Sequence, residues 1–230
     1  MCLPMRSHNL SRYMVVLVLA SLMVVSIVIY SHVGMVRRRA QQQQREKDLQ
    51  AWRKLIDDVI TGKSDCIVLA YGGPPDLDQK LPDIEHLRGL RTLCLEGIDV
   101  TRSRLACISK VPDLRELCLY GGVEHLSNQD FEILNEKASI ERLVLVYMDA
   151  HHQPLPALAR RPNLRDLTIF DRVRAGSSRT KGAWYWLEEL HQLKQLRIGG
   201  AGVTPRCLDH LRRVLPHTSI ELLKQEPSMK

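Results

Sequence analysis

Residues 114–120 read LRELCLY, and this stretch decides the fold. Leu114, Leu117 and Leu119 form an L-x-x-L-x-L frame. The frame recurs at Leu90-Leu93-Leu95, Ile140-Leu143-Leu145, Leu164-Leu167-Ile169 and Leu193-Leu196-Ile198, with partial copies at Ile67-Leu69 and Ile220-Leu222. Alternation along a strand turns both leucines of L-x-L to one face. Because so short a strand cannot bury that face alone, the copies must stack side by side into a parallel sheet.

The period of this frame is nearly regular. Between equivalent positions from Ile67 to Ile220 the steps are 26, 24, 26, 24, 29 and 24 residues. The pattern resembles the leucine-rich repeat family, whose period runs from about 20 to 29 residues. The closing copy, GVTPRCLDHLRRVLPHTSIEL, resembles the last repeat of bacterial membrane-anchored members. The resemblance implies an α/β solenoid of about six to seven repeats over residues 61–223, followed by a tail at 224–230.

The segments between the strands carry their own signals. Helical spacing predicts return helices over Ser103–Val111, Ser127–Asn135 and Thr204–Leu215, with Ser127 and Thr204 as N-caps. Pro154, Pro156 and the insertion RVRAGSSRTKGAWYW predict irregular returns elsewhere. One feature of the family is missing, because the position that usually holds a ladder of Asn or Cys carries other residues. They are Gly72, Ile98, Gly122, Met148, Arg172 and Ala201.

The composition of the 230 residues agrees with a repeat built from aliphatic layers. Leucine occupies 35 positions, whereas Phe occupies two and Trp three. The net charge of +7 invites a nucleic-acid partner, but most of it lies outside the repeats. Residues 1–36 carry +2, residues 37–60 carry +3, and 24 basic against 22 acidic residues leave only +2 for the rest. A nearly balanced repeat domain excludes a polyanion-binding stripe.

The N-terminal region predicts a membrane anchor. After a tail at residues 1–12, the chain reads YMVVLVLASLMVVSIVIY from Tyr13 to Tyr30, and no charge appears before Arg37. About 20 such residues span a bilayer core of roughly 30 Å, which predicts a transmembrane helix over Tyr13–Val36. A cleaved signal peptide is the main alternative, but the apolar run is longer than such peptides use.

The basic residues around this segment predict its orientation. Two arginines precede it, whereas seven arginines and lysines follow it within residues 37–60, so the repeat domain is expected in the cytoplasm. Six cysteines without a C-x-x-C pair agree with a reducing compartment. Residues 37–60 place Leu49, Trp52, Ile56 and Val59 at helical spacing, which predicts a juxtamembrane helix that caps the repeats. A lipid-surface or coiled-coil element is the alternative.

The sequence carries no catalytic motif. It contains no H-E-x-x-H, G-x-S-x-G, Walker loop or G-x-G-x-x-G. His151 and His152 are adjacent in sequence, so their side chains cannot share one helical or strand face as a metal pair. We therefore expect neither an enzyme, nor a cofactor or metal site, nor a small-molecule substrate, and we expect the lipid bilayer and an unidentified protein as partners.

A candidate thiol pair is the basis for a second hypothesis. Cys94 and Cys118 occupy the middle of L-C-L in consecutive strands, which places both on the open, concave face with Cα atoms about 4.8 Å apart. That separation lies in the range for a disulfide, although parallel strands usually keep the Cβ atoms too far apart. Two unrelated, half-exposed cysteines are the plainer interpretation. A thiol-redox or metal-sensing membrane protein is the alternative function.

The resemblance implies that the concave face is the contact surface. Tyr120, Tyr147 and Phe170 are expected beside neighbouring strands at its exposed rim, with Arg142 and Asp171 nearby, a combination typical of protein-binding hot spots. A local packing role for these aromatic side chains is the alternative. Glu116, Arg142 and Asp166 alternate in sign across adjacent strands, which predicts a salt-bridge ladder. The first hypothesis is thus a non-catalytic protein-interaction module.

Overall fold

The computed structural model describes residues 8–70, 81–123, 125–136, 139–148, 155–171, 184–200, 203–225 and 227. Within these ranges the side chains of residues 8–29, 31, 81, 135–136 and 147–148 lie outside the description. The chain divides into two compact units, Met1–Asp48 and Leu49–Lys230. The second unit holds the sheet and its covering segments.

The N-terminal part of the chain is helical. Helix α1 runs from His8 to Ile60, so the predicted helix over residues 37–60 is confirmed. The backbone of the predicted segment Tyr13–Val36 belongs to the same helix, but its side chains up to residue 29 lie outside the description. Among the residues that could be searched, no helix combines the length and the apolar character that crossing a membrane requires.

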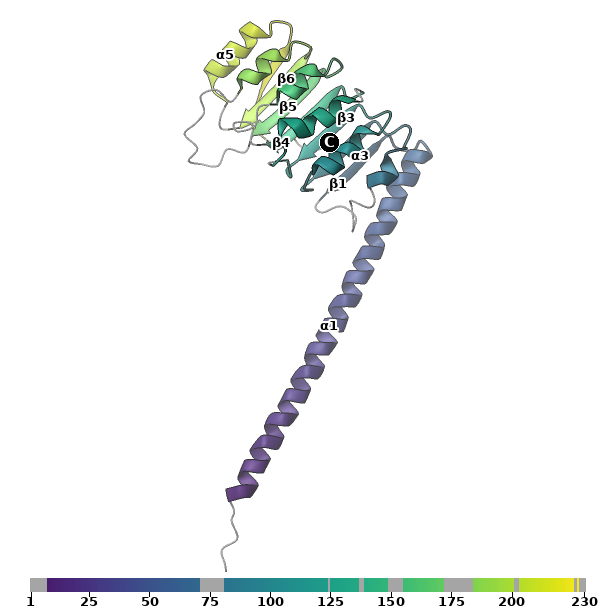
Figure 1. Cartoon of the computed structure of the whole chain (residues 1–230), viewed down its shortest axis with the longest axis vertical. Helices are drawn as coiled ribbons and strands as arrows, with labels where there is room; N and C mark the ends of the chain where they lie inside the picture. Colours follow the sequence, from purple (N-terminus) through teal and green to yellow (C-terminus); the bar gives the residue numbers. More distant parts are fainter. Residues whose placement is uncertain are drawn as a thin grey trace, which may run out of the picture. The chain divides into compact units, whose positions relative to one another are not determined.

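Seven parallel strands form one sheet whose order follows the sequence (Figure 1). The strands are β1 (Cys66–Ala70), β2 (Thr92–Glu96), β3 (Glu116–Tyr120), β4 (Arg142–Met148), β5 (Asp166–Asp171), β6 (Gln195–Gly200) and β7 (Ser219–Leu223). Their register pairs the equivalent positions of successive copies, so Leu93 lies beside Leu117 and Leu117 beside Leu143. The predicted stack of parallel L-x-L strands is confirmed, and the fold is a leucine-rich-repeat-like α/β solenoid.

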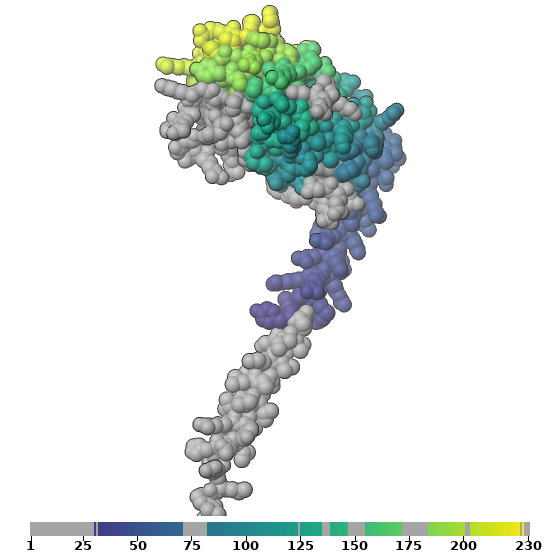
Figure 2. All heavy atoms as spheres, viewed as in Figure 1, coloured from purple at the N-terminus to yellow at the C-terminus, as the bar shows by residue number. Residues whose placement is uncertain are grey.

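One face of the sheet carries the core. The frame leucines Leu93, Leu117, Leu143, Leu167 and Leu196 are all fully buried there. The return segments cover this face and form the surface seen in Figure 2, where their colours follow one another in chain order. They are η1 (Leu81–Ile84), α3 (Arg102–Ser109), α4 (Asn128–Glu132), η2 (Ile133–Glu136), η3 (Pro156–Arg160), η4 (Tyr185–Glu189) and α5 (Pro205–Val214).

The predicted helical returns are present as α3, α4 with η2, and α5. Thr204 caps α5, since its hydroxyl accepts a hydrogen bond from the Cys207 N–H at 3.2 Å, and Pro205 takes the first helical position. At α4 the Asp130 carboxylate accepts from both the N–H and the hydroxyl of Ser127. The return with Pro156 is a 3₁₀ helix, as its prolines suggest. Residues 172–183 of the insertion lie outside the description.

Backbone contacts take the place of the missing asparagine ladder between β2 and β3. The Val100 N–H donates to the Gly122 carbonyl at 2.7 Å. Gly122 has a φ of +68°, and a Cβ there would lie 2.0 Å from the carbonyl oxygen of Ile98. Only glycine fits such a close approach. The turns after these strands therefore pack backbone against backbone, whereas Gly72, Arg172 and Ala201 lie outside the description.

The end of α1 caps the first repeat. Trp52 and Val59 are each 3% exposed and belong to the core, and the Trp52 indole N–H donates to the Asp83 carboxylate at 3.2 Å. Leu55 and Ile56 pack against the same core. The compact unit therefore begins at Leu49, earlier than the domain start at residue 61 that the sequence suggested.

Candidate functional site: the open face of the sheet

The face of the sheet opposite the returns carries three rows of side chains, one from each outward position of the strands. We call it the open face. The first row is Cys66, Thr92, Glu116, Arg142, Asp166, Gln195 and Ser219; the second is Val68, Cys94, Cys118, Val144, Thr168, Arg197 and Glu221; the third is Ala70, Glu96, Tyr120, Val146, Phe170, Gly199 and Leu223. Parallel pairing in register brings each row into line.

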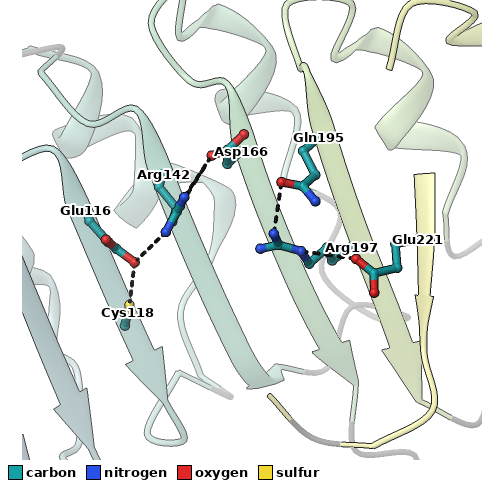
Figure 3. Close-up of polar contacts among 7 residues, drawn as sticks. All are labelled: Glu116, Cys118, Arg142, Asp166, Gln195, Arg197 and Glu221. Carbon is teal, nitrogen blue, oxygen red and sulfur yellow. Dashed lines mark hydrogen bonds and ion pairs between the residues drawn. The ribbon is translucent and has the colours of Figure 1, made fainter. Parts of the chain in front are cut away.

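An ion-pair ladder occupies the middle of the first row (Figure 3). The Arg142 guanidinium lies 3.4 Å from the Glu116 carboxylate and 3.3 Å from the Asp166 carboxylate. Burial lowers the pKa of Arg142, but the two carboxylates outweigh it and hold that pKa above its ordinary value. The predicted ladder is confirmed, and Arg142 remains 43% exposed at its side chain.

A second polar group lies towards β7 and was not predicted. Arg197 donates from Nη2 to the Gln195 side-chain oxygen at 2.9 Å and from Nε to Glu221 at 3.3 Å. Figure 3 shows both groups along one face of the sheet. The pairing of Arg197 with Glu221 could have been predicted from the sequence, because they are one repeat of 24 residues apart. That spacing places their opposite charges side by side in register.

An apolar cluster separate from the main core occupies the second and third rows. It consists of Cys94, Cys118, Tyr120, Val144 and Val146, with Phe170 packed against it. Tyr120 was expected at an exposed rim, but only 8% of it is exposed. The expectation is wrong because neighbouring strands lie about 4.8 Å apart, so side chains on adjacent strands shield one another. Phe170 is partly exposed and lies at the boundary of the cluster.

Of the two other predicted contact residues, Asp171 differs from the expectation, whereas the exposure of Tyr147 stays a prediction. Asp171 is 2% exposed, because strand alternation turns it away from the open face that Phe170 occupies. It therefore cannot serve as a surface contact. The register of β4 with β5 shifts between Val146 and Met148, so Tyr147 is the extra residue of an irregularity. Its side chain lies outside the description.

The thiol pair is brought together as predicted but is less accessible than expected. Cys94 and Cys118 pair in register, with exposures of 8% and 4%. A hydrogen bond with Cys118 lowers the pKa of Cys94, whereas the same bond and burial raise the pKa of Cys118. The Cys118 sulfur also lies 3.7 Å from the Glu116 carboxylate, to which its thiol donates. The thiols are thus connected to the ion-pair ladder.

Metal-ligating side chains do not converge in the part of the chain that the structure describes. No group of three or more His, Cys, Asp or Glu residues there is arranged to hold a metal ion. His210 lies 2.7 Å from Glu188 and meets the Tyr185 ring edge-on, which links α5 to η4. His151 and His152 lie outside the description.

Comparison with known proteins adds little to this picture. No protein-family model and no curated protein matches the chain. Among solved structures, the chain is similar to a leucine-rich repeat protein of Leptospira interrogans, with 14% sequence identity and a TM-score of 0.33. The match covers 67% of this chain and 43% of that protein, so the chain spans less than half of its length. The fold class stated above depends on the chain's own repeats and sheet.

Proposed function

We propose that this protein is a non-catalytic interaction module that binds another protein through the open face of its sheet. The observation that carries the proposal is the apolar cluster next to the ion-pair ladder on a face that the returns leave uncovered. A fold of this kind presents a broad surface formed by many strands, which suits a protein partner better than a small molecule.

Arg142 and Phe170 are the proposed centre of the contact. Arg142 is held between two carboxylates and remains half-exposed, so its position is set before a partner arrives. Phe170 lies partly exposed against the cluster that includes Val146. Arginine and aromatic side chains exposed on one surface are the composition that binding hot spots favour. Tyr120 belongs to the same cluster, in one row with Val146 and Phe170, and would support this contact from the side.

We also propose that residues Tyr13–Val36 anchor the protein in a membrane, with the repeat unit in the cytoplasm. The support is the uncharged run followed at once by Arg37, Arg38 and Arg39. In the described part of the run, Tyr30 is 82% exposed, and Val33, Met35 and Val36 are also exposed. Apolar side chains in that situation are suited to lipid rather than water.

Site-specific photocrosslinking tests the binding face. A photoreactive residue is placed in the full-length protein at Val68 or Glu221 on the open face, and at Arg102 or Tyr185 on the return side as matched controls. All four positions are exposed. We expect one protein to crosslink from the open-face positions only. Crosslinks confined to Arg102 and Tyr185 would contradict the assigned face.

The captured protein then allows a quantitative test. Its affinity for the purified chain is measured by calorimetry with Arg142→Glu and Phe170→Ala variants, and with Arg102→Glu as the control. Loss of a hot-spot side chain costs about 2 kcal/mol or more, which is a loss of affinity of about thirtyfold. Equal affinities for all variants would overturn the proposal.

Topology is tested separately. A reporter that is active on only one side of the membrane is fused after Lys230, and membranes are extracted with alkaline carbonate. We expect the chain to stay in the membrane fraction with cytoplasmic reporter activity. Release by carbonate would refute the anchor, and activity on the other side would refute the orientation.

A further inference from the structure

The open face places two cysteines where a covalent bond can form between neighbouring strands. Cys94 of β2 and Cys118 of β3 are directly opposite in register. Adjacent strands are about 4.8 Å apart, within the Cα range of disulfides, whose lower limit is about 4.4 Å. Both cysteines pack in one buried cluster, and their interaction lowers the pKa of Cys94 and raises that of Cys118.

The surroundings of the pair favour reaction between these two thiols. They lie in the apolar cluster with Tyr120 and Val144, so bulky thiols from outside have little access. The Cys118 thiol donates to the Glu116 carboxylate, with the sulfur 3.7 Å from the carboxylate oxygen. Glu116 is held in turn by Arg142 at 3.4 Å. The negative charge of Glu116 therefore lies beside the pair and raises the pKa of both thiols.

The other described cysteines are not paired in register with a second cysteine. Cys66 lies in the first row of β1, and its register partner is Thr92 rather than Cys94. Cys94 lies one strand across from Cys66 and two residues further along, so their Cα atoms are about 8 Å apart. That separation is beyond the range of a disulfide. Cys107 and Cys207 belong to α3 and α5 on the return side. Among the described cysteines, only Cys94 and Cys118 both lie opposite each other in the strand register and pack in one cluster.

We propose that Cys94 and Cys118 form a reversible intrachain disulfide when the protein meets a hydroperoxide, a reaction that goes beyond the binding function proposed for the same face. The Cys94 thiolate attacks one peroxide oxygen, the O–O bond breaks, and the departing oxygen takes a proton and leaves as water when the oxidant is hydrogen peroxide. Cys94 becomes a sulfenic acid. The Cys118 sulfur then attacks the Cys94 sulfur, and the S–O bond breaks. The hydroxide leaves as a second water with the Cys118 proton. Two thiols are oxidised and one peroxide is reduced.

The geometry also makes the bond readily reversible. Parallel strands in register hold Cβ atoms farther apart than the mean of about 3.8 Å in a disulfide, so the bridge must draw β2 and β3 together. Such a bridge is reduced more easily than a relaxed one. Its formation also removes the thiol that donates to Glu116, and so changes one end of the ion-pair ladder.

Oxidation of the full-length protein tests the site. The chain is purified in detergent, treated with hydrogen peroxide, blocked with a thiol reagent and digested. We expect a peptide pair that joins Cys94 to Cys118 and lacks the mass of two hydrogen atoms, and we expect dithiothreitol to restore both thiols. Alanine suits this buried apolar site, so the variants are Cys94→Ala and Cys118→Ala, with Cys207→Ala as the matched control.

The outcomes separate the alternatives without depending on any one variant. Loss of the linked peptide in the first two variants and its retention in Cys207→Ala support the site. A link that uses Cys66, or oxidation of Cys94 to a sulfinic acid without a link, would overturn it. Glu116→Gln removes a negative charge that raises the pKa of both thiols, so it should speed bridge formation severalfold. An unchanged rate would overturn the part given to Glu116.

Discussion

The ring of Phe170 occupies the space that a side chain at Gly199 would fill. Phe170 and Gly199 are register partners on β5 and β6, and a Cβ on Gly199 would lie 2.7 Å from Cδ2 of the ring. It would also lie 2.8 Å from the Leu223 Cβ on β7. The absence of a side chain at Gly199 thus allows Phe170 to lie along the open face beside its neighbours.

Gly199→Ala is therefore expected to lower the free energy of unfolding by about 1–3 kcal/mol, because overpacking forces the ring or the strand to move. Denaturant unfolding followed by circular dichroism measures the change. A double-mutant cycle with Phe170→Ala identifies the cause, since removing the ring should relieve part of the cost. Strict additivity of the two substitutions would show that the ring is not what the new methyl group meets.

Arg161 offers a second test, because it takes an apolar position of the repeat. In other copies Leu87, Val111 and Leu190 close the same turn, and each is buried. Arg161 is 2% exposed, donates to the Leu134 carbonyl, and has its pKa lowered by burial to about 10. A lowered pKa means that burial disfavours the charge in the folded state.

Replacing this buried charge with an apolar side chain of similar length should therefore cost little. For Arg161→Met we expect the free energy of unfolding either to change by less than about 1 kcal/mol or to rise. Replacing buried ionic groups with apolar side chains of similar volume often has this effect. Arg161→Ala should cost about 2 kcal/mol or more, since it leaves a cavity. Thermal unfolding of both variants checks this. A Met variant as unstable as the Ala variant would mean that the guanidinium hydrogen bonds outweigh its desolvation.

The cap formed by α1 predicts where the folded unit can be cut. Trp52 is 3% exposed against the first repeat, so Trp52→Ala should cost about 3–5 kcal/mol. A chain that starts at Leu49 should unfold cooperatively, whereas one that starts at Thr61 should be much less stable. Calorimetry of the two truncated chains measures the difference. The exposed Arg53 provides the matched substitution, and Arg53→Ala should have little effect. Equal melting temperatures for both truncations would contradict a capping role.

The start of α4 predicts a pH dependence. Hydrogen bonds from the Ser127 hydroxyl and N–H lower the pKa of Asp130 below its ordinary value. A carboxyl whose pKa is lowered on folding stabilises the folded state above its unfolded pKa, about 3.9, and loses that contribution as the pH falls through the folded pKa. Ser127→Ala should thus cost about 1 kcal/mol at neutral pH and less in acid.

Thr204→Ala is the control for this experiment. Thr204 caps α5 through the Cys207 N–H, and Cys207 rather than a carboxylate stands at the third helical position. The loss of stability caused by Thr204→Ala should stay constant as the pH is lowered, whereas the loss caused by Ser127→Ala should become smaller. Unfolding midpoints measured from pH 7 down to about pH 3 compare the two variants around the ordinary pKa of aspartate. Parallel curves would show that Asp130 does not carry the effect.

Much of this architecture could be predicted because it depends on local periodicity. The strands from β2 to β6 coincide with the L-x-x-L-x-L frames, and Thr204-Pro205 marks the start of α5. The opposite charges of Glu116, Arg142 and Asp166 could be paired because one repeat period separates them and register is set by the buried leucines. Cys94 and Cys118 were placed side by side by the same reasoning.

The accessibility of the candidate site was harder to predict, because it depends on neighbours from other repeats. Tyr120 is covered by side chains of adjacent strands, and the shift after Val146 changes how the end of β4 meets β5. Strand alternation around Asp171 could have shown that it turns from the open face, but its burial also requires the packing around it. The sequence marks which positions point outward, not how much of each remains exposed.

The sequence by itself determined the period, the strand positions and the order of rows on the sheet, because burial of regularly spaced leucines allows one register only. The tertiary structure decided which outward side chains remain accessible. It buried Tyr120, Cys94 and Cys118 in a second cluster and left Arg142 half-exposed between two carboxylates. The physical reason is that register follows from spacing along one chain, whereas exposure is the combined effect of several strands that lie about 4.8 Å apart.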